Sequence, residues 1–152
     1  MPKVAVIIGS KSDQETMQIT IDLLSELGIE AELKVASAHR DPEAVAEYVK
    51  KSVENGVEIF IAAAGGAAAL PGVVASHTPL PVIGVPLTSS EMKGIDSLYS
   101  IVQMPPGMPV ATVALGGWGA RNSAVLAAQI LGLKYDKIAE ANKAYRQRLR
   151  ER

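Results

Sequence analysis

The fold is indicated near the start of the chain by Lys3-Val-Ala-Val-Ile-Ile-Gly9, which is followed directly by Ser10-Lys-Ser-Asp13. Val4–Ile8 is a continuous apolar run, which is typical of a strand buried on both faces of a sheet. Ser12-Asp-Gln-Glu15 has the capping-box pattern, so we expect a helix to begin there and to end near Gly28. A strand that leads directly into a helix predicts the first half of a β-α-β unit.

The same alternation of strand and helix patterns continues along the chain. Asp41-Pro42 supplies an N-cap and a first-turn proline for the second helix. Further strands are predicted at Glu30–Ala36, Glu58–Ala64, Pro81–Val85 and Val110–Leu115, and further helices near Leu70–His77, Gly94–Val102, Asn122–Leu131 and Tyr135–Arg150. Right-handed crossovers then predict a single α/β domain over residues 1–152. We expect a three-layer, doubly wound parallel sheet of the flavodoxin-like type, with five strands in the order 2-1-3-4-5 and a C-terminal helix.

Three of these helices carry patterns that predict which face is buried. Val45, Val49 and Val53 mark one face of the helix after Asp41-Pro42. Ile138, Ala141, Tyr145 and Leu149 mark one face of the last helix. The segment Asn122–Leu131 is apolar all round, so we expect it to be buried on several sides. A monomer would leave such a helix exposed as a large apolar patch, which favours a closed homo-oligomer.

Composition and charge exclude several classes of protein. The 152 residues are 48% hydrophobic and 20% charged, which is ordinary for a globular domain. A formal net charge of -1 provides no global field for nucleic acid or a membrane surface, so we expect neither as a partner. There is no cysteine, which excludes disulfides and thiolate chemistry. The start is wrongly built for a signal peptide and no apolar run reaches transmembrane length, so we expect a cytoplasmic protein.

Unusual segments follow four of the predicted strands, at the sheet edge where doubly wound folds bind ligands. The first, Gly9–Asp13, offers the hydroxyls of Ser10 and Ser12 and the free N–H groups of a helix start, which suit an anion. Asp13 would repel a phosphate but could accept hydrogen bonds from ribose hydroxyls. The segment lacks the Walker pattern, and a role for Ser12 and Asp13 as helix caps alone stays open.

The second segment, Ser37-Ala-His-Arg40, contains one of only two histidines. His39 can transfer protons near neutral pH, and the planar fork of Arg40 suits a phosphate or carboxylate. The alternative is that His39 ends a strand and Arg40 pairs with Asp41 on the surface. The other histidine, His77, is expected to be structural or to lie in an interface.

The third segment is glycine- and alanine-rich and runs from Ala64 to Gly72. Backbone amides around Gly65 and Gly66 can form an anion-binding concavity, and the missing side chains leave room for a flat ring. A tight strand-to-helix turn would need the same glycines. The fourth segment is Pro86-Leu-Thr-Ser-Ser90.

Together these segments resemble the N5-carboxyaminoimidazole ribonucleotide mutase family, the catalytic part of bacterial phosphoribosylaminoimidazole carboxylase. The resemblance covers nearly the whole chain. It is carried by Gly9–Asp13, Ser37–Arg40, Gly65-Gly-Ala-Ala-Ala-Leu-Pro-Gly72, Gly84-Val-Pro86 and the long stretch Asp96–Ala111, which contains Val102-Gln-Met-Pro-Pro-Gly-Met-Pro109.

The resemblance implies an enzyme of purine (IMP) synthesis that converts the N5-carboxy form of aminoimidazole ribonucleotide (N5-CAIR) into the 4-carboxy form. It implies a homo-octamer with sites at subunit junctions, no metal, no organic cofactor, and a functional link to a separate synthetase that makes the carbamate. His39 would be the general acid/base. Substrate-binding residues would be Ser10, Ser12, Asp13, Ser37, Arg40, Gly65, Gly66, Ala69 and Leu70, with Ser12 and Ser37 helping to hold the phosphate.

One departure from the family pattern concerns Ala69. The family usually has a histidine there, lining the pocket of the migrating carboxylate. Its absence leaves two alternatives open: a carboxylase that uses free CO2, or a catalytically impaired homologue that only binds the ribonucleotide. The stretch Val102–Pro109 resembles the mutase branch.

Overall fold

The structure, a computed structural model, describes all 152 residues and is built around one five-stranded sheet. All strand pairs are parallel, and the order is β2-β1-β3-β4-β5, as the sequence predicted. The strands are β1 Lys3–Ile8, β2 Glu30–Val35, β3 Val57–Ala64, β4 Val82–Pro86 and β5 Ala111–Thr112. The predicted flavodoxin-like topology is confirmed.

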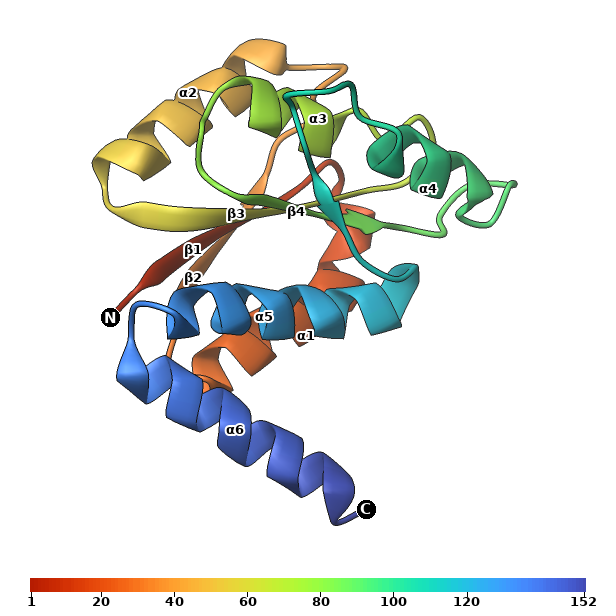
Figure 1. Ribbon diagram of the computed structural model, residues 1–152. Helices are drawn as coiled ribbons and strands as arrows, with labels where there is room; N and C mark the ends of the chain where they lie inside the picture. Colours follow the sequence, from red (N-terminus) through yellow and green to blue (C-terminus); the bar gives the residue numbers. More distant parts are fainter.

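Helices cover both faces of the sheet and make a three-layer molecule (Figure 1). One face carries α2 (Pro42–Glu54), α3 (Leu70–Ser76) and α4 (Ile95–Val102). The other carries α1 (Gln14–Glu26) and α5 (Gly116–Gly132), and the last helix, α6 (Asp136–Arg150), packs on α5. A short 3-10 turn, η1 (Lys11–Asp13), joins β1 to α1.

The central strands are buried because each of their faces meets a different helical layer. In β1, Val4, Val6 and Ile8 belong to the core beneath α1 and α5, whereas Ala5 and Ile7 belong to the core beneath α2 and α3. This alternation follows from the period of two along a strand. It explains why β1 reads as an uninterrupted apolar run in the sequence.

Helices α1 and α5 lie close together because small side chains line their contact. Ala120, Ala124 and Ala127 are fully buried, and the hydroxyl of Thr20 donates to the Ala120 carbonyl at 2.7 Å. That bond satisfies a buried hydroxyl that would otherwise destabilise the core. Only Asn122 and Gln129 are exposed within Asn122–Leu131. The expectation that this helix would present a large apolar patch in a monomer is therefore wrong, because the sheet, α1 and α6 cover it.

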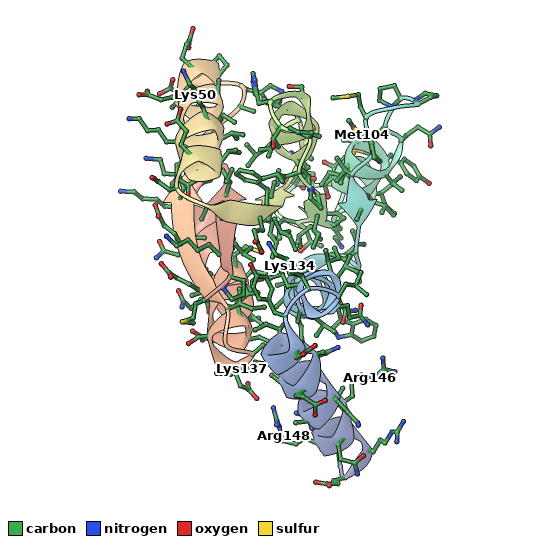
Figure 2. The ribbon with its side chains drawn as sticks, turned by 60° about the vertical axis from the view of Figure 1, so that its left-hand side comes forward. Lys50, Met104, Lys134, Lys137, Arg146 and Arg148 are labelled. Atoms are coloured by element: carbon green, nitrogen blue, oxygen red, sulfur yellow. The ribbon has the colours of Figure 1, made fainter.

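Helix α6 projects from the body of the molecule. Ile138 and Tyr145 are buried, whereas Leu149, which the pattern also placed on the inner face, is 42% exposed near the free end. Figure 2 shows Lys137, Arg146 and Arg148 on this helix, away from the sheet. Arg148 pairs with Glu26 of α1. None of the helices has both the length and the hydropathy that a membrane span requires.

Helix α1 begins differently from the prediction. Ser12 is not the cap; the Ser10 side chain instead accepts from the Ser12 backbone N–H, which starts η1, and α1 follows at Gln14. The capping box was wrong because a 3-10 turn precedes the helix. The Asp41 cap of α2 is confirmed by its side chain accepting from the Ala44 N–H at 3.1 Å. Val53 in α2 is 41% exposed, against expectation, because it lies in the last turn.

The fifth strand and the helix after it also differ from the prediction. Strand β5 has only two residues instead of Val110–Leu115, and α5 begins at Gly116 instead of Asn122. A Cβ on Gly119 would lie 1.7 Å from the Ala114 carbonyl oxygen. The chain leaves the sheet after Val113, whose N–H still donates to the Gly84 carbonyl at 3.1 Å, and Ala114 packs against the first turn of α5. That contact overrides the low helix propensity of a glycine-rich segment.

Candidate active site

The loops that follow four strands meet around one cavity of about 250 Å³ at the carboxyl edge of the sheet. It is lined by nine of the ten residues that the sequence indicated: Ser10, Ser12, Asp13, Ser37, His39, Arg40, Gly65, Ala69 and Leu70. Gly66, the tenth, does not line the cavity and instead makes the turn beside it, with φ of 62°. Parallel strands end at the same edge, so loops distant in sequence become neighbours.

The loop after β1 presents hydroxyls and one carboxylate to the cavity. The Ser10 and Ser12 hydroxyls lie 3.0 Å apart, and the Ser10 oxygen also accepts from the Ser12 N–H at 3.3 Å. Asp13 is buried at the start of α1. Burial raises the pKa of the Asp13 carboxyl above its usual value, with no hydrogen bond from the chain to oppose the shift. The charged form of such a carboxylate is stabilised by any ligand that donates hydrogen bonds to it.

The loop after β2 is a tight turn that leaves two functional side chains free. The Ser37 hydroxyl accepts from the Arg40 backbone N–H at 3.3 Å, and the Asp41 N–H donates to the Ser37 carbonyl at 2.8 Å. The Asp41 carboxylate caps α2, and Arg40 forms no ion pair within the chain. The surface pair between Arg40 and Asp41 is therefore absent. His39 and Arg40 are exposed, and both line the cavity.

The loop after β3 forms a wall of small residues and backbone. Ala68 lies in the left-handed region with φ of 43°, although it is not a glycine, and its N–H donates to the Gly65 carbonyl at 3.2 Å. A non-glycine residue in that region stores about 1–3 kcal/mol of strain, and such strain gathers at functional sites. Ala69 and Leu70 continue the wall into α3. The wall offers no charged or acidic side chain.

The loop after β4 contributes Ser89, a cavity residue that the sequence did not single out. A Cβ on Gly65 would lie only 2.2 Å from the Ser89 hydroxyl oxygen, so these two residues lie directly against each other. The segment Pro86–Ser90 was recognised as a strand end, but its run of three hydroxyl residues contained no signal to choose among them. Gly9, Ala38, Ala64 and Ala68 complete the lining; they lie inside the predicted strand-end segments but were not named as site residues.

A larger cavity of about 870 Å³ lies at the opposite edge, where β4 and β5 begin. Its lining comes from Ala75–Val82 and Gly107–Ala111, and His77 is its only titratable side chain. The smaller cavity instead gathers His39, Arg40 and Asp13. We therefore place the chemistry at the carboxyl edge. No group of three or more histidine, cysteine, aspartate or glutamate side chains is arranged to hold a metal ion.

Comparison with known proteins decides the family. The family model described as AIR carboxylase matches residues 3–152, which is nearly the whole chain. The chain belongs to the AIR carboxylase family. Its relatives include proteins named N5-carboxyaminoimidazole ribonucleotide mutase. The one from Saccharolobus solfataricus is 55% identical, covering 99% of this chain and 94% of its own, and the one from Thermotoga maritima is 53% identical, covering 99% and 86%.

A solved structure supports the same family assignment. PurE from Treponema denticola superposes with a TM-score of 0.90 at 30% identity, covering 99% of this chain and 93% of its own. The resemblance inferred from five sequence motifs is thereby confirmed. As a member of the AIR carboxylase family, the chain carries Ala69 at the position where that resemblance predicts a histidine.

Proposed function

We propose that this protein is an N5-carboxyaminoimidazole ribonucleotide mutase of purine synthesis, an isomerase that moves a carboxylate from the exocyclic nitrogen to ring carbon C4. One observation carries the proposal. The cavity brings His39, Arg40 and Asp13 together beside a wall of small apolar residues. Those groups match an anionic sugar phosphate, a flat ring and a small neutral intermediate. The AIR carboxylase relatives of this chain are named mutases. Residues 1–152 act as one domain.

The polar side of the cavity would hold the phosphoribosyl group. Arg40 is free of ion pairs, and its guanidinium can bind phosphate oxygens through paired hydrogen bonds. Ser10, Ser12 and Ser37 offer hydroxyl donors on the same side. The Asp13 carboxylate would accept hydrogen bonds from the ribose hydroxyls, which supplies the partners that it lacks in the free chain.

His39 would carry out both proton transfers. As the imidazolium it donates a proton to the carbamate nitrogen, the N–C bond breaks, and CO2 is released inside the cavity. Ring carbon C4 then attacks CO2 and forms the new C–C bond. The neutral imidazole removes the C4 proton, which restores the aromatic ring and the starting state of His39.

The small-residue wall would confine the CO2 between these steps. Ala68, Ala69 and Leu70 present apolar surface, which suits a small uncharged molecule and does not hydrate it. Keeping CO2 beside C4 replaces a bimolecular encounter with an intramolecular one, so confinement contributes to rate as much as proton transfer does. Gly66 makes the turn beside the cavity, and the small side chains of the wall leave room for the flat ring.

We also propose that the active form is a homo-octamer in which neighbouring copies close the site. The cavity of one copy, about 250 Å³, lies below the usual range for ligand sites of about 300–1,000 Å³. Three large apolar side chains of α4 are exposed in the single chain: Ile95 at 46%, Tyr99 at 64% and Val102 at 49%. Trp118, at the start of α5, is 82% exposed. A second copy covering these side chains would remove apolar surface from water. Light scattering that shows an active monomer at micromolar concentration would contradict this.

Ala69 supports a second candidate function. Without a polar side chain at this position, the cavity lacks one group that could hold the carboxylate. The alternatives to the mutase reaction are therefore direct carboxylation by free CO2 and ribonucleotide binding without turnover. Ala69→His tests the mutase against these alternatives when kcat/KM for carboxylate transfer and melting temperature are measured on the same variant. A rise in kcat/KM supports the mutase. A fall in both means that the wall has repacked around alanine, with an overpacking cost of about 1–3 kcal/mol.

The direct test is turnover of the purified protein with each form of the substrate. The mutase converts the N5-carboxy ribonucleotide without added bicarbonate, and a separate synthetase would have to supply that carbamate. A carboxylase instead acts on the decarboxylated ribonucleotide with dissolved CO2. Binding without turnover of either substrate would refute both enzyme assignments.

A further inference from the structure

Ser89 lies at the opposite end of the cavity from the residues that suit a phosphate. The sheet order places β2 and β1 beside each other, then β3, then β4. The Ser10 and Ser37 loops follow β1 and β2, whereas the Ser89 loop follows β4. Neighbouring strands lie about 4.8 Å apart, so the end of β4 is roughly 10 Å from the end of β1 across β3. A ligand whose phosphate binds near β1 and β2 therefore extends its ring over β3 toward Ser89.

The Ser89 hydroxyl is also the one side-chain polar group at that end of the cavity. The wall that it faces consists of Ala64, Gly65, Ala68, Ala69 and Leu70, none of which has a polar side chain. Among the other serine hydroxyls of the cavity, Ser10 and Ser12 bond to each other, and Ser37 accepts from the Arg40 N–H while its own O–H stays available to a phosphate. Ser89 Oγ makes no hydrogen bond within the chain, although its neighbour Ser90 does.

The loop that carries Ser89 is held on both sides. The Leu87 N–H donates to the Ala64 carbonyl at 2.9 Å, and the Leu87 carbonyl accepts from the buried Ser97 hydroxyl at 2.7 Å. On the other side, the Ser90 hydroxyl donates to the Asp96 carboxylate. The exposed Ser89 therefore lies between two fixed residues, Leu87 and Ser90, before a ligand binds, and a preorganised backbone lowers the ordering cost of binding.

Gly65 leaves the space that Ser89 occupies. Its φ is not positive, so the backbone itself does not require glycine there. Glycine is required at position 65 because a Cβ there would lie 2.2 Å from the Ser89 hydroxyl oxygen. The loops after β3 and β4 thus fit together so that this hydroxyl reaches into the cavity.

We propose that Ser89 is a specificity-determining residue whose hydroxyl donates a hydrogen bond to the carboxylate of the carboxylated ribonucleotide. The inference rests on the proposed function, because it takes the ligand to be a ribonucleotide with a carboxylate on its ring end. Ser89 would distinguish this ligand from its decarboxylated form, which lacks the acceptor. It would supply at the far wall a polar contact that Ala69 cannot make.

The test compares two ligands on the full-length protein by titration calorimetry: 4-carboxy-5-aminoimidazole ribonucleotide and 5-aminoimidazole ribonucleotide. A hydrogen bond to a charged acceptor predicts that Ser89→Ala weakens binding of the carboxylated ligand about tenfold and leaves the other ligand unchanged. Ser25→Ala, on the exposed side of α1, is the matched control and leaves both affinities unchanged. Equal effects of Ser89→Ala on the two ligands, or no effect, would overturn the proposal.

A second variant tests the same contact from the other side. Gly65→Ala forces the Ser89 hydroxyl to rotate away, so it should produce the same selective loss. In the double variant with Ser89→Ala the steric clash disappears and the two losses should not add. Additive losses would overturn the proposed contact. If the unaltered protein binds both ligands but converts neither, the mutase assignment fails. The affinities of the Ser89→Ala variant for the two ligands still decide whether Ser89 binds the carboxylate.

Discussion

Asp13→Asn should make the free protein more stable while weakening its binding of the ribonucleotide. Asp13 is 8% exposed, and burial raises the pKa of its carboxyl. Burial therefore makes the charged form of this group unfavourable for folding. Asparagine keeps the size of the side chain and removes the charge.

The magnitude follows from two opposing effects. An unsatisfied buried polar group destabilises a protein by about 1–3 kcal/mol, and the lower end applies because Asp13 borders a cavity that water can enter. A negative charge at the start of α1 typically gains about 0.3–1 kcal/mol from the helix dipole. Burial, the cause of the raised pKa, acts in the opposite direction. We expect Asp13→Asn to raise the free energy of unfolding at pH 7 by about 1 kcal/mol.

The raised pKa of Asp13 also fixes how the stability gain of Asp13→Asn depends on pH. Because the pKa of Asp13 is higher in the folded chain than in the unfolded chain, the folded state takes up its proton first as pH falls. The penalty is complete above the folded pKa and absent below the unfolded value of about 3.9. The stability advantage of Asp13→Asn should therefore be full at pH 7 and vanish below about pH 4.

Urea unfolding of both proteins across this pH range is the measurement, with calorimetric titration of the ribonucleotide at pH 7. Losing a charged acceptor for ribose hydroxyls should weaken binding by about 1.5–3 kcal/mol. Glu15→Gln is the control, because this exposed carboxylate lies in the first turn of the same helix and should give no stability gain. An Asp13→Asn variant that is less stable at pH 7, or an advantage that persists at pH 4, would show that burial does not set the energy of this carboxylate.

Three further predictions follow from the site and the fold. His39→Asn should lower kcat by about 10²–10⁴-fold with ribonucleotide binding largely retained, and near-normal kcat would remove His39 from the acid/base role. Arg40→Ala should weaken ribonucleotide binding by about 1.5–3 kcal/mol and leave the free nucleoside unaffected, and calorimetry showing equal losses would mean that Arg40 does not bind the phosphate. Gly119→Ala should destabilise the protein by about 3 kcal/mol, because the new Cβ would lie 1.7 Å from the Ala114 carbonyl oxygen. Gly117→Ala, whose nearest neighbour is 3.9 Å away, should instead stabilise it by about 0.5 kcal/mol in the same urea unfolding experiment.

Most of the sheet could be predicted because its signals are local and periodic. The apolar runs Val4–Ile8 of β1 and Ile59–Ala64 of β3 correspond to strands buried on both faces, and parallel strands joined by helices allow few orders. The Asp41 cap is equally local, because it depends on residues within one turn. The four strand-end segments could be identified for the same reason. Their meeting in one cavity follows from parallel strands ending at one edge of a sheet.

The tertiary structure decided what depends on contacts between distant segments. Val113–Leu115 has a strand-like sequence but packs against α5, because Gly119 admits the Ala114 carbonyl at a distance that no side chain allows. Residues Gly116–Gly119 have low helix propensity and are helical nevertheless. Among the hydroxyls after β4, Ser89 alone lines the cavity, and the space that it occupies is left by Gly65, 24 positions earlier in the chain. Local sequence therefore determined the elements and their order, whereas packing between residues far apart in the chain determined where β5 ends, where α5 begins and which hydroxyl enters the site.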